Sequence, residues 1–324
     1  DYQSELFSHD ALAYETNVSL SAGSDVTKYF VSANDKSDPG TMIKTYARRQ
    51  NLRLNLDQTV GTKWTGNFSA SIYRSMTARG ISNNDNTFTS PFYAFGYTPA
   101  VVDLRQKNAA GNPIDNVMLR TLVGIGSNPF QTITAVKDDE DVWRQIGSAQ
   151  LRYAALTSQS QSLTLSATGG FDRYDAEGRT YSPNFLQFEP DDGFPGTSVQ
   201  AEGLSKLFNG SLNAVHTYTP SSSVPILSSF SSLTSSAGLQ MEVRQLNRYS
   251  VLARGLLPGV ENINQGTPTL DQRKTLVRNQ ASYLSEELLA MNERLSVSAR
   301  VRGERSSSNG DRKQFFYWPA GAAS

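Results

Sequence analysis

Alternation of apolar and polar residues is the most persistent pattern along the chain. In the stretch RRQNLRLNLD, residues 48–57, the apolar Leu52, Leu54 and Leu56 alternate with the polar Asn51, Arg53, Asn55 and Asp57. Successive side chains of a strand point to opposite faces, so this stretch predicts a strand with one apolar and one polar face. Such a strand fits a soluble antiparallel sandwich as well as a membrane barrel.

The same alternation recurs often enough to predict about eleven strands. Near the other end Leu295, Val297, Ala299 and Val301 alternate with serine and arginine. The predicted strands are residues 17–23, 27–34, 46–60, 63–74, 143–156, 162–174, 206–218, 235–249, 274–284, 294–305 and 313–323. Most are close to the ~9 to 11 residues with which a tilted strand crosses a bilayer.

The polar faces and the connections favour the barrel. Small hydrophilic residues fill the polar faces and suit a watery lumen better than a dry sandwich core. The connections alternate between short and long, although 219–234 is long for a turn and 306–312 is short for a loop. An up-and-down barrel with short periplasmic turns and long external loops predicts this order, and a Greek-key sandwich does not.

We therefore predict an all-β fold, an antiparallel up-and-down transmembrane β-barrel segment. The long connection 75–142 is expected to be an ordered loop, because structureless loops of that length are uncommon. Residues 286–289, EELL, are expected to form a helical turn.

Composition excludes several other classes of protein. The 30 basic and 30 acidic residues cancel, so no electrostatic footprint for nucleic acid exists. Cysteine is absent and there are two histidines, too few for a typical zinc centre. No run approaches the ~20 apolar residues of a membrane-spanning helix. The chain starts at Asp1 without a leader, so we expect a processed protein or part of a longer polypeptide.

No residues with the spacing of a catalytic, metal or cofactor motif occur, so no enzyme is predicted. Two acidic runs, at 138–141 and 189–192, are expected in loops. They are interpreted as solvated loops rather than calcium sites, because neither has the spacing of an EF-hand. Glu189 and Asp192 also form the only pair considered for a glycosidase on a β-sandwich.

Aromatic residues in the long connections are the candidate ligand contacts. Flat rings stack on sugars or peptide groups, although rings in loops more often pack against each other. The candidates are Phe92, Tyr93, Phe95, Tyr97, Tyr181, Phe185, Phe188 and Phe194. Trp64, Trp143 and Trp318, near strand ends, suit an interfacial aromatic girdle, and His216 is interpreted as an interface residue.

Several segments, taken in order, resemble the SusC/RagA-type TonB-linked outer-membrane transporters. YQSELF at 2–7, NVSLSAGS at 17–24 and KYFVSA at 28–33 are similar to the family's successive motifs, as is RQNLRLN at 49–55. RVRGERSS at 300–307, followed by FYWP at 316–319, is similar to a later pair. Ala22 replaces the first glycine of the family's usual pair, and Glu304 stands where many members have aspartate.

The resemblance implies that residues 1–324 form about 11 of about 22 barrel strands, with the plug domain and the remaining strands outside this chain. It implies TonB-dependent import of a nutrient such as an oligosaccharide or peptide. The implied location is the outer membrane of a Gram-negative bacterium. The implied partners are outer-membrane lipid, a SusD-like surface lipoprotein and, through absent parts, the TonB complex.

In such a barrel the apolar strand faces meet lipid and the polar strand faces point to the lumen. The expected lumen-facing residues are Arg53, Asn55, Asp57, Arg300 and Arg302. The alternative is a structural or adhesive outer-surface β-protein without transport, and the sequence does not identify a substrate.

Overall fold

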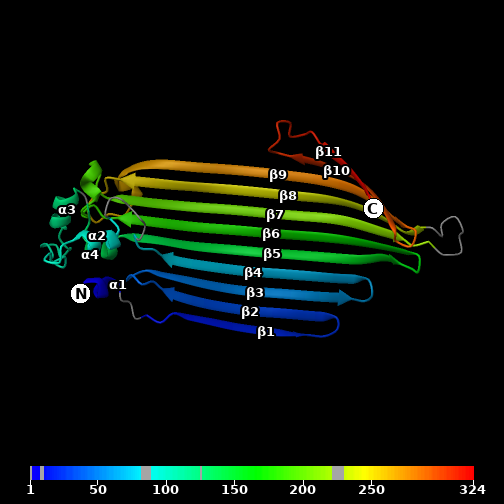
Figure 1. Ribbon diagram of the computed structural model, residues 1–324, viewed down its shortest axis with the longest axis horizontal. Helices are drawn as coiled ribbons and strands as arrows, with labels where there is room; N and C mark the ends of the chain where they lie inside the picture. Colours follow the sequence, from blue (N-terminus) through cyan, green and yellow to red (C-terminus); the bar gives the residue numbers. More distant parts are fainter. Residues whose placement is uncertain (1, 8–10, 82–88, 125, 221–229) are drawn as a thin grey trace.

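The computed structural model describes residues 2–7, 11–81, 89–124, 126–220 and 230–324. These residues form one antiparallel sheet of eleven strands, paired in chain order from β1 to β11. Short helices gather at one end of the long strands (Figure 1). The predicted all-β, up-and-down antiparallel fold is confirmed, and each predicted strand forms at its expected place in the order.

The strands differ in length along the sheet. Their bounds are β1 Tyr14–Gly23, β2 Thr27–Pro39, β3 Tyr46–Val60, β4 Trp64–Ala78, β5 Lys137–Thr157, β6 Gln161–Ser182, β7 Thr197–Tyr218, β8 Phe230–Arg254, β9 Thr267–Ala290, β10 Leu295–Ser306 and β11 Phe316–Ala323. Strands β5 to β9 have 21 to 25 residues each, well beyond their predicted lengths. In β5 to β7 nearly all the extra residues lie toward the helical end, whereas β8 and β9 extend at both ends.

Two local expectations are wrong. Residues 286–289 belong to β9, where Leu288 pairs with Val297 of β10 and Leu233 of β8. Ladder hydrogen bonds on both sides outweigh the helical preference of this short run. The acidic run 138–141 lies in β5 rather than in a loop.

The helices occupy the long connections. They are α1 Tyr2–Phe7, α2 Pro91–Tyr97, α3 Val117–Val123 and α4 Pro129–Ala135, with two 3₁₀ turns, η1 Glu189–Asp192 and η2 Ile263–Gln265. None of the described helices is long and apolar enough to cross a membrane. Three of the four α-helices lie between β4 and β5, in the described part of the connection that was expected to be an ordered loop, while residues 75–78 and 137–142 belong to the two strands.

Strand register gathers the apolar residues on one face. Leu54 faces Val31 of β2 and Ala70 of β4, and Leu212 of β7 faces Leu239 of β8. These side chains stay open to solvent: Leu212 is 58% exposed and Leu239 is 59% exposed. The sheet therefore presents a broad apolar face that the described residues leave uncovered.

Most of the buried apolar side chains lie at the helical end. One cluster contains Leu6, Met42 and Ile133, and a second contains Tyr181, Ala253 and Leu256. The sheet edges are open, since β1 pairs with β2 alone and β11 pairs with β10 alone among the described strands. Packing therefore fixes the helical end, whereas backbone pairing and alternation define the sheet.

Candidate functional site

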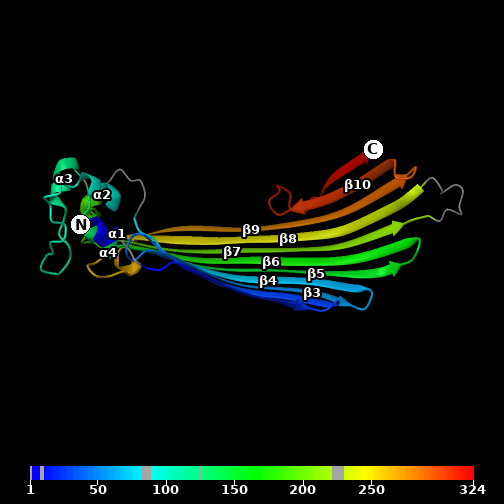
Figure 2. The same cartoon turned by 60° about the horizontal axis from the view of Figure 1, so that its bottom comes forward.

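The helices and the connections around them form a compact unit at one end of the sheet, which we call the helical cap. It comprises residues 2–7, 40–45, 89–136 and 183–196 without residue 125, and it lies beyond the ends of the strands in both views (Figures 1 and 2). Leu6 and Phe7 of α1 pack with Met42 and with Ile133 of α4. The cap therefore joins the start of the chain to the long connection between β4 and β5.

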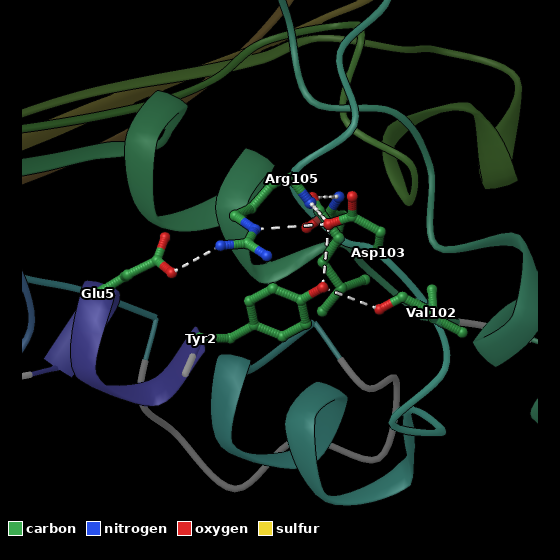
Figure 3. A network of polar contacts seen from close by, with 7 residues as sticks. Tyr2, Glu5, Val102, Asp103 and Arg105 are labelled. Carbon is green, nitrogen blue, oxygen red and sulfur yellow. Dashed lines mark hydrogen bonds and ion pairs between the residues drawn. The ribbon is translucent and has the colours of Figure 1, made fainter.

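A polar network ties α1 to the 99–115 segment (Figure 3). The hydroxyl of Tyr2 donates to the carbonyl of Val102 at 3.1 Å and to the Asp103 carboxylate at 3.0 Å. The Arg105 guanidinium lies over the Tyr2 ring and pairs with Glu5 at 3.2 Å. The backbone N–H of Arg105 and then the Tyr2 hydroxyl hold the pKa of Asp103 below its usual value.

Buried amide side chains form the interior of the cap. Asn116 and Gln187, each nearly inaccessible, bond reciprocally although 71 residues separate them. The backbone N–H of Asn116 donates to Gln187 Oε1 at 2.6 Å, and Gln187 Nε2 donates to the Asn116 carbonyl at 3.2 Å. Asn116 also begins α3, because its side chain accepts from the Leu119 N–H. One amide pair thus joins the β4–β5 and β6–β7 connections.

Asn128 holds a second part of the cap. Its Nδ2 donates to the carbonyls of Leu104 and Ile114 at 2.9 and 2.7 Å, and its Oδ1 accepts from the Phe130 N–H at 2.9 Å. The sequence carried a signal for this helix start, since Asn128 precedes Pro129 at the first helical position. The long-range amide contacts had no such signal.

The acidic run of η1 is occupied by bonds within the protein. Glu189 is 7% exposed and accepts from the Gly196 N–H at 2.8 Å and the Thr197 hydroxyl at 3.0 Å. Asp191 pairs with Arg120 of α3 at 2.7 Å, and Asp192 pairs with Arg254 of β8. In the described part of the chain no cluster of acidic residues or histidines is arranged to hold a metal ion. This run fastens the β6–β7 connection to the cap and to β8.

The eight candidate aromatics differ in exposure. Tyr181 is 6% exposed in the second buried cluster, and Phe95 packs against the first. Tyr93 and Phe188 are half-buried. Four rings remain open to solvent and are the members still able to meet a ligand: Phe92, Tyr97, Phe185 and Phe194. Their role as ligand contacts stays a prediction.

The five expected lumen residues share the polar face of the sheet. Register places Asn55 beside Ser69, whose hydroxyl is 2.8 Å from that of Ser148. At the other end Arg302 pairs with Glu304 at 3.0 Å and donates to Gln240 at 2.9 Å. Their function as lumen lining is untested and remains a prediction.

A hollow of about 540 Å³ lies beside Arg302. Its lining carries amides and carboxylates, including Asn209, Gln240, Glu242 and Asn279. Such groups bind hydroxyl or amide groups of a ligand, because each offers hydrogen-bond donors or acceptors. Strand register brings these residues together, with Asn209 beside Glu242 and Glu242 beside Asn279.

Neither a protein-family model nor a curated protein matches the sequence. The fold is similar to solved structures of the RagAB peptide transporter, with a TM-score of 0.62 and 13% identity over 95% of this chain and 33% of that chain. A second RagAB structure, in the closed-closed state, gives a TM-score of 0.63 and 14% identity over 96% of this chain and 33% of that one. The structure of FpvA of P. aeruginosa bound to heterologous pyoverdines gives a TM-score of 0.52 and 12% identity over 96% of this chain and 38% of that chain.

The chain spans about a third of the length of the RagAB chains that it matches. At these identities the likeness concerns the fold, and it extends over nearly all of this chain. The chain therefore has the fold of part of a SusC/RagA-type, TonB-linked outer-membrane transporter.

Proposed function

We propose that this chain supplies barrel wall and external loops to a TonB-dependent outer-membrane importer. The cargo class is a nutrient such as an oligosaccharide or a peptide. The observation that carries the proposal is the two-faced sheet, with a broad exposed apolar face, a polar face rich in hydrogen-bonding groups and two open edges. In lipid such edges cost several kcal/mol for each unpaired backbone group, so further strands complete the wall.

The apolar face is proposed to meet lipid. On β6, residues 163–171 carry Leu163, Leu165, Ala167 and Phe171 on this face, a run as long as a tilted strand needs to cross a bilayer. Arg173 and then Asp175 follow on the same face. The rest of β6 therefore projects beyond the membrane and carries the helical cap outside the cell.

The proposed partners follow from this orientation. The solved neighbours include the RagAB peptide importer, described in open-open and closed-closed states. By that analogy a SusD-like surface lipoprotein covers the external end, where the cap lies. A plug domain and a TonB-contacting segment, both outside this chain, couple import to the inner membrane of a Gram-negative bacterium.

The transport proposal is tested in the organism that carries the complete gene. A deletion strain is grown on a peptide mixture or on plant oligosaccharides as the limiting nutrient, with and without TonB. We expect a growth defect on one nutrient class that matches the defect of the TonB deletion. Normal growth on every class, with loss of surface adhesion, would favour the structural or adhesive alternative.

The orientation is tested by matched arginine substitutions on β3. Leu54→Arg on the apolar face is expected to cost about 2 to 4 kcal/mol of folding free energy in lipid vesicles, the range for arginine near the bilayer midplane. Asn55→Arg, on the opposite face one residue away, is the control and is expected to be close to neutral. Urea titration of the complete protein in vesicles measures both, and a neutral Leu54→Arg variant would refute the orientation.

A further inference from the structure

Two cations face each other across β6 and β7, just beyond the apolar run. Arg173 and Lys206 are register partners, and both side chains are open to solvent. Directly opposed like charges destabilise a sheet unless an anion compensates them. Asp175 accepts from Arg173 at 2.7 and 3.3 Å, but no described acidic side chain forms an ion pair with Lys206. The pair therefore lacks part of its counter-charge.

The neighbouring strands add hydrogen-bond donors at the same level. Gln145 of β5 is the register partner of Arg173, and Gln245 of β8 is the partner of Lys206. The four side chains form one row across β5 to β8 on the face that carries the apolar residues. Guanidinium, ammonium and amide groups together suit a phosphate, which offers several acceptor oxygens and negative charge.

An apolar hollow lies next to this row. Phe171 and Phe208, also register partners, are each two residues from the cation of their own strand, about 6.6 Å along the strands toward the apolar run. Beyond them Gly169 faces Gly210, and a β-carbon at Gly169 would meet no atom within 4 Å. The hollow has a volume of about 950 Å³, and its lining includes Phe208, Leu212 and Met241.

We propose that Arg173 and Lys206 bind the phosphate of a phosphorylated lipid whose acyl chain fills the apolar hollow. The cations lie where the apolar run ends, so the phosphate sits at headgroup level and the chain runs toward the membrane interior. Charge complementarity selects the occupant, since an uncharged apolar partner would leave the opposed cations uncompensated. This proposal rests on the orientation given under Proposed function, in which the apolar face meets lipid.

The test is native mass spectrometry of the complete protein in a neutral detergent, titrated with dioleoyl phosphatidic acid. Dioleoylglycerol, with the same chains and no phosphate, and inorganic phosphate are the comparison probes. We expect phosphatidic acid to bind more tightly than either probe. The double variant Arg173→Gln with Lys206→Gln should lose affinity about tenfold or more, since it removes both charge-assisted contacts.

The control variant is Arg152→Gln, which removes a positive charge on the opposite face of β5, and it should bind as the unaltered protein does. Heat-dependent gel mobility verifies that each variant is folded. Equal affinity of the double variant, or equal binding of dioleoylglycerol, would overturn the headgroup site. If inorganic phosphate binds as tightly as phosphatidic acid, the lipid assignment is overturned. If the protein forms a dimer without lipid and the double variant abolishes that dimer, the site is instead a contact with a second copy of the chain. The Leu54→Arg experiment tests the orientation without any added lipid ligand, so failure of the headgroup site and failure of the orientation are distinguishable.

Discussion

The reciprocal bond between Asn116 and Gln187 gives the sharpest prediction about the helical cap. Gln187→Ala removes the acceptor of the Asn116 N–H, which lies at 2.6 Å. The Asn116 carbonyl loses the Gln187 amide but keeps the Arg120 N–H of α3 as a donor. Asn116 is fully buried, so its N–H would be left unsatisfied without access to water, at a cost of about 1 to 3 kcal/mol.

That cost should appear as local opening of α3 rather than loss of the sheet. Asn116 begins α3 and also donates to the Thr98 hydroxyl at 2.7 Å, so its displacement removes the cap of the helix. Hydrogen–deuterium exchange of the complete protein measures the opening free energy of residues 117–123. We expect exchange of this segment to accelerate by at least about fivefold, which corresponds to the lower end of the range.

Gln106→Ala is the matched control, because Gln106 is an exposed glutamine of the same cap. It should leave exchange in α3 unchanged, and both variants should leave exchange in β6 and β7 unchanged. If Gln187→Ala leaves residues 117–123 as protected as in the unaltered protein, the buried amide pair does not hold the cap together.

Two further substitutions test the polar face and the β8–β9 connection. Gly238→Ala places a β-carbon 2.3 Å from the Tyr283 ring and is expected to cost about 1 to 3 kcal/mol in urea titration, whereas Gly178→Ala, with no atom nearer than 4.0 Å, should be neutral. Glu261 accepts a hydrogen bond from Lys137, which holds the pKa of Glu261 below its ordinary value of 4.5. The stabilisation of the folded β8–β9 connection by this carboxylate is therefore complete above pH 4.5. It is lost as the pH falls through the lower pKa of the folded state. Limited proteolysis by pepsin at decreasing pH should show increasing cleavage within residues 255–266 in this range. Glu261→Gln should abolish this increase. An unchanged increase in the variant would contradict the role of Glu261.

The strands were predictable because alternation is a local signal. At Leu52, Leu54 and Leu56 each residue reports its own face, and no distant contact is needed to interpret it. The signal fades in the outer half of β6, where Arg173, Asp175 and later residues put charge on the apolar side. The apolar alternation is lost there, so the predicted strand is shorter than the observed one.

The cap was less predictable because its decisive contacts are distant in sequence. Asn116 and Gln187 look like ordinary loop amides until the fold buries them together. Local signals did exist for the helices, as in Asn128-Pro129, and they support the interpretation of 75–142 as an ordered connection. Local helical preference was misleading at 286–289, where pairing with β8 and β10 decides the conformation.

The strict chain order of the sheet has a consequence for how the wall is assembled. Each strand bonds to the strand made just before it and the one made just after it, so no pairing waits for a distant segment. Each pairing therefore closes only a short loop and has a small entropic cost, except at the long β4–β5 connection. Buried polar contacts within that connection, such as those of Asn128 with Leu104 and Ile114, shorten the effective gap between β4 and β5. Assembly can thus proceed hairpin by hairpin from β1 to β11.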